Sequence, residues 1–134
     1  MGSVVIVLDT HVLVWLRTCP DQLSKAAGDA IRKELKNDCV SIAAVTLWEL
    51  SWLATNGRID PGGTVPAFLK KITAGVVILP LTVEIAAQAA AFPRASYPTD
   101  PADRLIGATA LTSGSNLVTK DNTIRRSSLV RTIW

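Results

Sequence analysis

The chain has 134 residues, of which 49% are hydrophobic, and a formal net charge of +3. This length is sufficient for one domain with a substantial core, and the composition argues against intrinsic disorder. No apolar run approaches the roughly 20 residues that a membrane-spanning helix needs, and the opening run lacks the basic flank of a secretory signal. We therefore expect one folded domain over residues 1–134, located in the cytoplasm.

The histidine and cysteine content restricts the kinds of metal site. One histidine is present, which excludes a multi-histidine zinc site. Cys19 and Cys39 do not have metal-ligand spacing, and we expect both to be free thiols. The mildly basic charge is compatible with a nucleic-acid ligand, but many proteins without such a ligand have a similar charge.

An apolar run from Val4 to Leu8 opens the chain and ends at Asp9. Such a run is typical of a buried parallel strand. Ligands of open α/β sheets bind in the crevice beyond the carboxyl ends of the strands. The sequence therefore places Asp9 where a ligand would bind.

Apolar periodicity, helix caps and Gly or Pro breaks predict the elements that follow. Helices are expected over residues 10–17, 23–36, 43–55, 65–73, 82–91 and 101–112. Strands are expected over 39–41, 76–79 and 116–119, a turn over 120–122, and the tail 129–134 can form a last strand. The alternation predicts an α/β fold with a parallel sheet and helices on both faces. No Gly-x-Gly-x-x-Gly or Gly-Lys-Ser/Thr motif indicates a dinucleotide or P-loop site.

Four acidic residues stand at comparable places in these elements. Asp9 and Asp121 follow the ends of predicted strands, whereas Glu49 and Asp103 lie on helix faces whose neighbours are mostly apolar or small. Carboxylates brought together raise each other's pKa unless a cation neutralises them. Oxygen ligands alone suit Mg²⁺ or Mn²⁺. We therefore predict that the four acids converge on a divalent cation that can promote phosphodiester hydrolysis.

Each acid also has a purely structural interpretation. Asp9 and Asp100 can cap the helices that follow them, and Asp121 can belong to an ordinary turn. Glu49 can form a salt bridge with an arginine. Gly107 costs up to ~1 kcal/mol in a helix interior, which a close approach to another backbone would explain.

Four segments carry motifs that occur together in one known family. They are Leu8–His11 with Trp15, Leu47–Leu50, Asp100–Ala110 and Leu117–Asp121. Over essentially its whole length, the chain resembles the PIN-domain ribonucleases, in particular VapC-type toxins of bacterial toxin–antitoxin pairs. The resemblance implies a three-layer α/β/α sandwich, a homodimer, Mg²⁺- or Mn²⁺-dependent cleavage of RNA, and neutralisation by a cognate antitoxin.

The resemblance also assigns roles to residues. The catalytic and metal-binding quartet corresponds to Asp9, Glu49, Asp103 and Asp121, with Asp100 as an auxiliary ligand or a cap. Residues expected to contact the substrate or line its pocket are Thr10, Arg104, Thr119, Lys120, Arg125 and Arg126. Arg104 can alternatively anchor its helix.

Other residues are interpreted from their surroundings. Arg17, Arg58 and Arg94 can follow an RNA backbone or simply be solvated. His11 can act as a general base, but its apolar neighbours favour packing or hydrogen bonding. Trp48 and Trp52 are one helical turn apart, which favours core or dimer packing over base stacking.

Rival functions differ in what they require. A non-catalytic PIN-fold module that binds RNA or a partner would be expected to have lost a quartet acid, and this chain has all four. An aspartyl-nucleophile phosphatase would need an acid two residues after Asp9, where His11 stands. A DNA substrate instead of RNA stays open.

Overall fold

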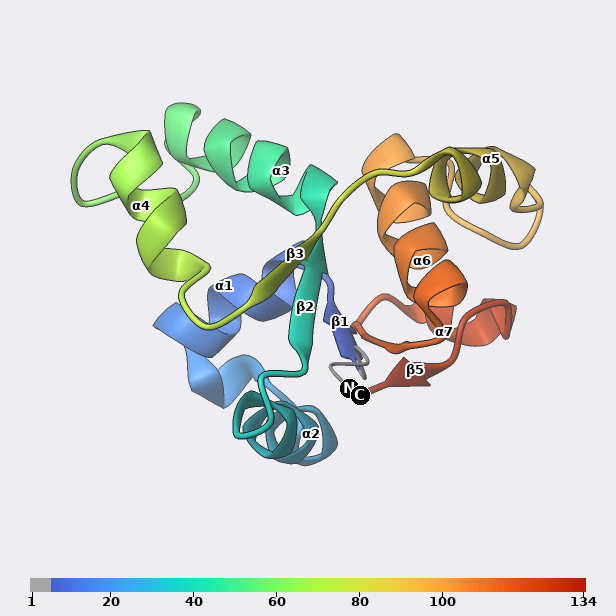
Figure 1. Ribbon diagram of the computed structural model, residues 1–134, viewed down its shortest axis with the longest axis horizontal. Helices are drawn as coiled ribbons and strands as arrows, with labels where there is room; N and C mark the ends of the chain where they lie inside the picture. Colours follow the sequence, from blue (N-terminus) through green and yellow to red (C-terminus); the bar gives the residue numbers. More distant parts are fainter. Residues whose placement is uncertain (1–5) are drawn as a thin grey trace.

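A parallel sheet forms the centre of the computed structural model, which describes residues 6–134 (Figure 1). Its strand order is β3-β2-β1-β4-β5, and every neighbouring pair is parallel. The strands are β1 (Ile6–Leu8), β2 (Val40–Ala43), β3 (Val77–Leu79), β4 (Asn116–Val118) and β5 (Thr132–Ile133). The predicted strands are confirmed, except that Val4 and Val5 lie outside the described residues.

The helices surround this sheet. They are α1 (Thr10–Thr18), the 3₁₀ turn η1 (Pro20–Gln22), α2 (Lys25–Leu35), α3 (Ala44–Thr55), α4 (Val65–Ile72), α5 (Val83–Ala91), α6 (Pro101–Ser113) and α7 (Asn122–Ser127). The six predicted helices are confirmed to within two residues at each end. The prediction missed α7, which begins immediately after Asp121. None of the helices over residues 6–134 is long and apolar enough to span a membrane.

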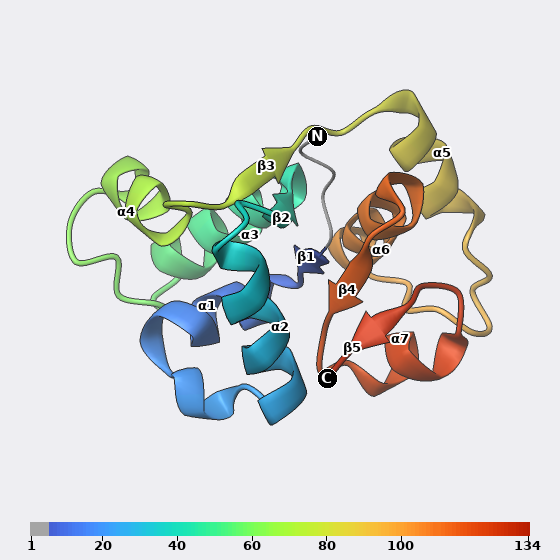
Figure 2. The same cartoon turned by 60° about the horizontal axis from the view of Figure 1, so that its bottom comes forward.

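Two hydrophobic cores lie on opposite faces of the sheet. Ile6 and Leu8 of β1 contribute to the core shared with α1–α4. Val7 points the other way, into the core shared with α5–α7, as the two-residue period of a strand requires. Figures 1 and 2 show these two groups of helices on either side of the sheet. The predicted three-layer α/β/α sandwich is therefore confirmed.

The order of strands reverses between β1 and β4, and this reversal positions the site. The chain leaves β1 towards β2 and β3 on one side, then crosses to β4 on the other side of β1. Crevices beyond the carboxyl ends of such strands bind ligands. The Asp9 N–H donates to the Val118 carbonyl at 3.0 Å, which holds the ends of the two strands together.

Two tryptophans of α3 lie outside the cores. Trp48 is 63% exposed and Trp52 is 45% exposed. Core packing, one of the two interpretations favoured by the sequence, is therefore wrong for both, because α3 is apolar almost all round and only part of it can face the sheet. Their packing in a dimer stays a prediction. Cys19 and Cys39 are free thiols, as expected.

Candidate active site

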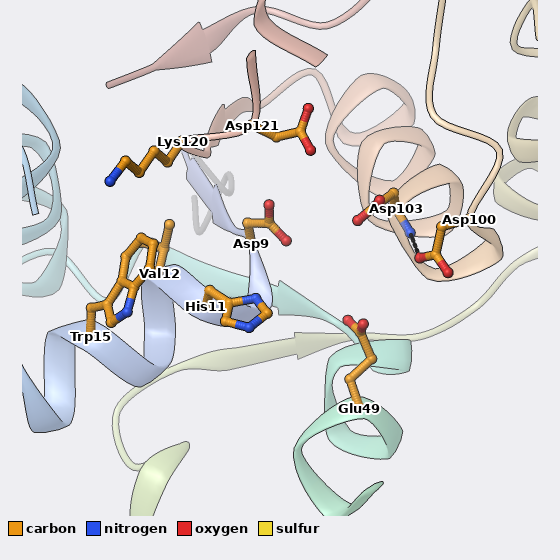
Figure 3. A pocket seen from close by; sticks show the side chains of 9 residues that line it. All are labelled: Asp9, His11, Val12, Trp15, Glu49, Asp100, Asp103, Lys120 and Asp121. Carbon is orange, nitrogen blue, oxygen red and sulfur yellow. Dashed lines mark hydrogen bonds between the residues drawn. The ribbon is translucent and has the colours of Figure 1, made fainter. Parts of the chain in front are cut away.

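The structure brings the four predicted acids together in one pocket of about 570 Å³ (Figure 3). Its lining residues are Asp9, His11, Val12, Trp15, Glu49, Asp100, Asp103, Lys120 and Asp121. Figure 3 shows the carboxylates of the quartet turned towards a common space, from the end of β1, from α3, from α6 and from the segment after β4. The four acids thus lie close together, as predicted, while their roles in metal binding and catalysis stay predictions.

Asp9 is held by hydrogen bonds on both carboxylate oxygens. Its Oδ1 accepts from the Thr10 N–H at 2.8 Å, which caps α1, and its Oδ2 accepts from the Thr119 hydroxyl at 2.8 Å. The same Thr119 oxygen accepts from the Asp121 N–H at 3.1 Å. One buried hydroxyl therefore fixes Asp9 relative to Asp121.

Glu49 is oriented by a pair of threonines. The Thr10 hydroxyl donates to Glu49 Oε1 at 2.5 Å, and the Thr46 hydroxyl lies 3.0 Å from the Thr10 hydroxyl. A hydroxyl has one proton, so Thr46 must donate to Thr10 when Thr10 donates to Glu49. Thr46 is fully buried. The sequence analysis missed its role, although a threonine three residues before Glu49 lies on the same helix face.

The roles expected for Thr10 and Thr119 require correction. Their exposed fractions are 1% and 0%, and neither lines the pocket. They therefore lie behind the pocket lining, contrary to the expected placement, and their contact with a substrate stays a prediction. Their hydroxyls act from behind the pocket, where they orient the carboxylates of Glu49 and Asp9.

Asp100 and Asp103 belong to the beginning of α6. Asp100 Oδ2 accepts from the Asp103 N–H at 3.1 Å, and Pro101 follows in the first turn, so Asp100 is the predicted cap. Asp103 is half-buried, and its helix face continues through the buried Ile106 and Gly107. The cap and the inward face together direct Asp103 into the pocket.

Burial and like charges disfavour ionisation of the carboxyl groups in this pocket. Burial, followed by the charges of Asp9, Asp100, Asp121 and Glu49, raises the pKa of Asp103 to about 7. The negative charges are therefore in unfavourable surroundings when no cation is present.

The pKa values of Asp9 and Glu49 are also raised, again mainly by burial. The hydrogen bonds from Thr119 and Thr10 partly oppose this rise, because they stabilise the ionised carboxylates. Over residues 6–134, ion pairs involve only Asp29 with its helical neighbours. The alternative in which an arginine neutralises Glu49 is therefore not realised.

The donor set fits a hard divalent cation. The acidic side chains that line the pocket offer carboxylate oxygens as ligands, which suits Mg²⁺ or Mn²⁺. No three acidic, histidine or cysteine side chains in the described part of the chain are close enough to form a closed metal site. The pocket is instead an open group of carboxylates. Lys120 lines it, but over residues 6–134 none of the pocket's acids forms an ion pair, and a bound cation would stabilise such a group.

Arg104 points away from the pocket. Its guanidinium donates to the carbonyls of Ala89 at 2.8 Å and Pro98 at 2.9 Å, and also to the Phe92 carbonyl. These bonds fasten the last turn of α5 and the 92–99 loop to α6 next to the Asp100 cap. They agree with the anchoring alternative and leave substrate contact by Arg104 without structural support.

The remaining predicted basic contacts differ in position. Lys120 lines the pocket and is exposed. Arg125 and Arg126 are exposed in the last turn of α7, outside the pocket lining, and their contact with a substrate stays a prediction. Arg17 donates to the carbonyls of Ile72 and Ala74, which ties α1 to the end of α4.

His11 lies at the pocket surface. Its side chain is exposed, and its ring makes a tilted contact with Trp15 at 6.1 Å between centroids. The contact with Trp15 agrees with the expected packing role, although the first turn of α1 opens into the pocket and leaves the ring exposed; a role as general base stays untested.

Replacing Thr119 with valine should weaken the link between Asp9 and Asp121. Valine keeps the volume but leaves two partly buried polar partners without their bond, so we expect a loss of about 1–2 kcal/mol in the free energy of unfolding. Urea denaturation measures this loss. Thr119→Ser keeps the hydroxyl and is the matched control. Equal stabilities of the valine and native proteins would contradict the arrangement.

Comparisons with known proteins agree with this fold and site. The PIN domain model matches residues 6–128. The chain is 40% identical over 131 residues to "Ribonuclease VapC22" of Mycobacterium tuberculosis (strain ATCC 25618 / H37Rv), covering 96% of this chain and 98% of that protein. The chain belongs to the PIN-domain family, as a VapC-type member.

Solved structures share the fold at low sequence identity. A structure of VapBC2 from Rickettsia felis bound to a promoter DNA fragment matches with a TM-score of 0.72 and 14% identity, covering 96% of both chains. A structure of DNA-bound VapBC from Salmonella typhimurium matches with a TM-score of 0.72 and 19% identity, also covering 96% of both chains. At these identities the likeness supports the architecture alone.

Proposed function

We propose that this protein is a divalent-metal-dependent endoribonuclease and the toxin of a toxin–antitoxin pair. The observation that carries the proposal is the convergence of Asp9, Glu49, Asp103 and Asp121 in one pocket, where none of them forms an ion pair with a basic side chain over residues 6–134. The similarity to a ribonuclease over nearly the whole chain supports RNA as the substrate.

The chemistry follows from the residues of the pocket. The quartet would hold Mg²⁺ or Mn²⁺, with Asp100 as an auxiliary ligand. When bound, such an ion would polarise the scissile phosphate and favour ionisation of the attacking water. None of the lining residues is a serine, threonine or cysteine, which favours water over a side-chain hydroxyl or thiol as the nucleophile. Hydrolysis would leave a 5′-phosphate and a 3′-hydroxyl.

The protein's own residues prepare the pocket for this reaction. Thr119 and Thr10 hold Asp9 and Glu49 in fixed orientations. Lys120 places a positive charge at the rim, where it attracts a phosphate. The site thus has a positively charged residue at its rim, which attracts anions, and acidic residues in its interior.

Cleavage of a mixed RNA pool with Mg²⁺ or Mn²⁺ tests the proposed function. Parallel reactions contain EDTA, the Asp9→Asn variant, or single-stranded DNA in place of RNA. We expect RNA to be cut by the native protein alone and only with metal. Cutting that survives EDTA or Asp9→Asn would contradict the proposal. RNA binding without cutting would favour a non-catalytic module. Preferential cutting of DNA would show that the substrate is DNA rather than RNA.

A cognate antitoxin is the partner that this function requires. Structural relatives include "Toxin-antitoxin complex from Klebsiella pneumoniae", which matches with a TM-score of 0.59 at 19% identity. That complex belongs to another protein, and the partner of this chain is part of the proposal. An antitoxin segment that covers the pocket would stop cleavage by keeping RNA from the acids.

Dimerisation through the free edge of the sheet is a further part of the proposal. The edge strand β3 exposes Val77 and Ile78, and the loop and helix after it expose Leu81 and Val83, the last at 81%. Exposed apolar side chains beside an unpaired strand edge favour association with a second copy.

Leu81→Lys should convert the dimer to a monomer, because a charged side chain would be placed within the apolar contact. Sedimentation equilibrium of the native and variant proteins measures the change. Val65→Lys on α4 is a control outside this surface. A native protein that is monomeric at micromolar concentration, or a Leu81→Lys protein that stays dimeric, would contradict this assignment.

A further inference from the structure

One wall of the acidic pocket is aromatic and cationic. Trp15 and Lys120 both line the pocket, and Figure 3 shows them on the side opposite Asp100 and Asp103. The Lys120 ammonium lies 5.7 Å from the centroid of the Trp15 ring. Trp134 also contacts Trp15, at 6.0 Å between centroids and an interplanar angle of 56°. We call Trp15, Lys120 and Trp134 the Trp15 wall.

The packing of Trp15 differs from that of its neighbours on α1. Val12 and Leu13 are fully buried in the core, whereas Trp15 is only partly buried and is not a member of that core. Trp134 restricts the orientation of its ring. A fixed and partly open indole loses little conformational freedom when a flat ligand stacks on it.

The charge of Lys120 is available to a ligand. Over residues 6–134 it forms no ion pair, although it is adjacent in sequence to Asp121 and lines a pocket rich in carboxylates. Its ammonium lies against the indole by a cation–π contact, which is weak at an exposed site. A phosphate would therefore attract this side chain away from the ring and leave the ring face open.

The wall also lies within reach of the acids. Trp15 is six residues beyond Asp9 along α1, a rise of roughly 9 Å. Unpaired bases stack on aromatic side chains, whereas bases inside a duplex are already stacked on each other. An indole beside a phosphate-binding lysine suits one unpaired nucleotide.

We propose that the Trp15 wall binds an unpaired nucleotide within one or two positions of the scissile phosphate, with its base on Trp15 and its phosphate on Lys120. This inference rests on the proposed ribonuclease function. Trp15 and Lys120 are then substrate-positioning residues, and the acids supply the chemistry.

Binding to three probes tests the proposal in an Asp9→Asn background, which prevents cleavage. The probes are a fluorescent single-stranded RNA octamer, the same sequence in a duplex, and an abasic ribose-phosphate octamer. Trp15→Leu should weaken binding of the single strand about tenfold, since stacking contributes ~1–3 kcal/mol per base. Binding of the duplex and of the abasic chain should change little, and Trp15→Phe should retain most of the affinity.

Lys120→Ala should act differently. It removes one phosphate contact, so binding of the base-bearing and abasic single strands should weaken together. The slope of log affinity against log salt should fall in magnitude by about 0.7. Trp52→Leu, which replaces an exposed tryptophan outside the pocket lining, is the matched control and should leave all three affinities unchanged.

The alternative is that Trp15 only packs against Trp134 and His11. Under that interpretation Trp15→Leu would leave binding unchanged or would weaken the base-bearing and abasic probes equally, and either result would overturn the proposal. Thermal melting checks that each variant is folded. If Trp15→Leu does not fold, the results for Trp15→Phe and Lys120→Ala still test the proposal.

Failure of the proposed function would give a different result from failure of this inference. If the native protein cleaves RNA but the Asp9→Asn protein binds no single strand, or binds single strand and duplex equally, the wall assignment is wrong while the function stands. If no RNA is bound or cleaved, the proposed function fails and the inference fails with it.

Discussion

Replacing Asp103 with asparagine should abolish RNA cleavage and at the same time stabilise the metal-free protein. The pKa of Asp103 is raised to about 7 by burial and by the neighbouring acids, so its charge opposes folding at neutral pH. Asparagine keeps the shape and removes the charge. We expect a gain of about 1–2 kcal/mol after allowing for screening by solvent, and a loss of cleavage of roughly a hundredfold or more.

The stability gain should depend on pH in a defined direction. Because the folded-state pKa of Asp103 is about 7 and its ordinary value is 3.8, the folded state holds this proton more tightly than the unfolded state does. The contribution of this group is fully present below its ordinary pKa and is lost as pH rises through about 7. The raised pKa values of Asp9 and Glu49 act in the same direction.

Thermal melting in EDTA between pH 4 and pH 8 measures this dependence. The native protein should lose stability across that window, and Asp103→Asn should lose less. Asp29→Asn is the matched control, because Lys25 and Arg32 lower the pKa of Asp29 and its replacement should not stabilise the protein. An Asp103→Asn protein that melts below the native protein at pH 8 in EDTA would refute the electrostatic account.

Gly107→Ala should destabilise the protein, although alanine is the better helix former. A Cβ at position 107 would lie 1.8 Å from the hydroxyl oxygen and 2.8 Å from Cζ of Tyr97. Tyr97 is 2% exposed, stacks on Phe92 at 4.2 Å and donates to the Asp103 carbonyl at 3.1 Å. The ring must therefore move. We expect a net loss of roughly 2 kcal/mol, since the steric cost exceeds the ~1 kcal/mol gained in helix propensity.

Denaturation of single and double variants isolates this contact. Tyr97→Phe in the Gly107→Ala background removes the hydroxyl but not Cζ, so it should recover part of the loss. Gly63→Ala has no atom within 4 Å of the new Cβ and should be nearly neutral. A Gly107→Ala protein as stable as the native one would show that Tyr97 does not lie against this glycine.

The sequence indicated the fold because its local signals agree. Ser24, Thr64 and Thr82 cap the beginnings of α2, α4 and α5 with their side chains, and Gly114 ends α6 with a φ of 68°. Asp9 lies at the end of a strand and Asp103 lies on the inward face of a helix. Both positions follow from local elements, without reference to contacts between distant segments. For that reason the meeting of the acids could be expected before the structure was known.

Other features depend on contacts between distant segments, which local patterns do not encode. Gly107 was expected to approach another backbone, but it faces the side chain of Tyr97. The bond between Thr10 and Glu49 spans 39 residues of sequence. The carbonyls that hold Arg104 belong to the last turn of α5 and to the loop that follows it, whose path no periodicity describes. The brief α7 was missed because six residues are too few to show a helical period.

A titration with Mn²⁺ followed by thermal melting tests most directly whether the four carboxylates form a cation site. The native protein should melt at progressively higher temperature, with a stabilisation of about 2.7 kcal/mol at a hundred times the dissociation constant. Asp9→Asn and Asp103→Asn should lose most of this response, and Asp29→Asn should keep it. A native protein whose melting temperature is unaffected by Mn²⁺ and by Mg²⁺, or an Asp9→Asn/Asp103→Asn protein that responds as the native one does, would contradict the assignment of these acids as a metal site.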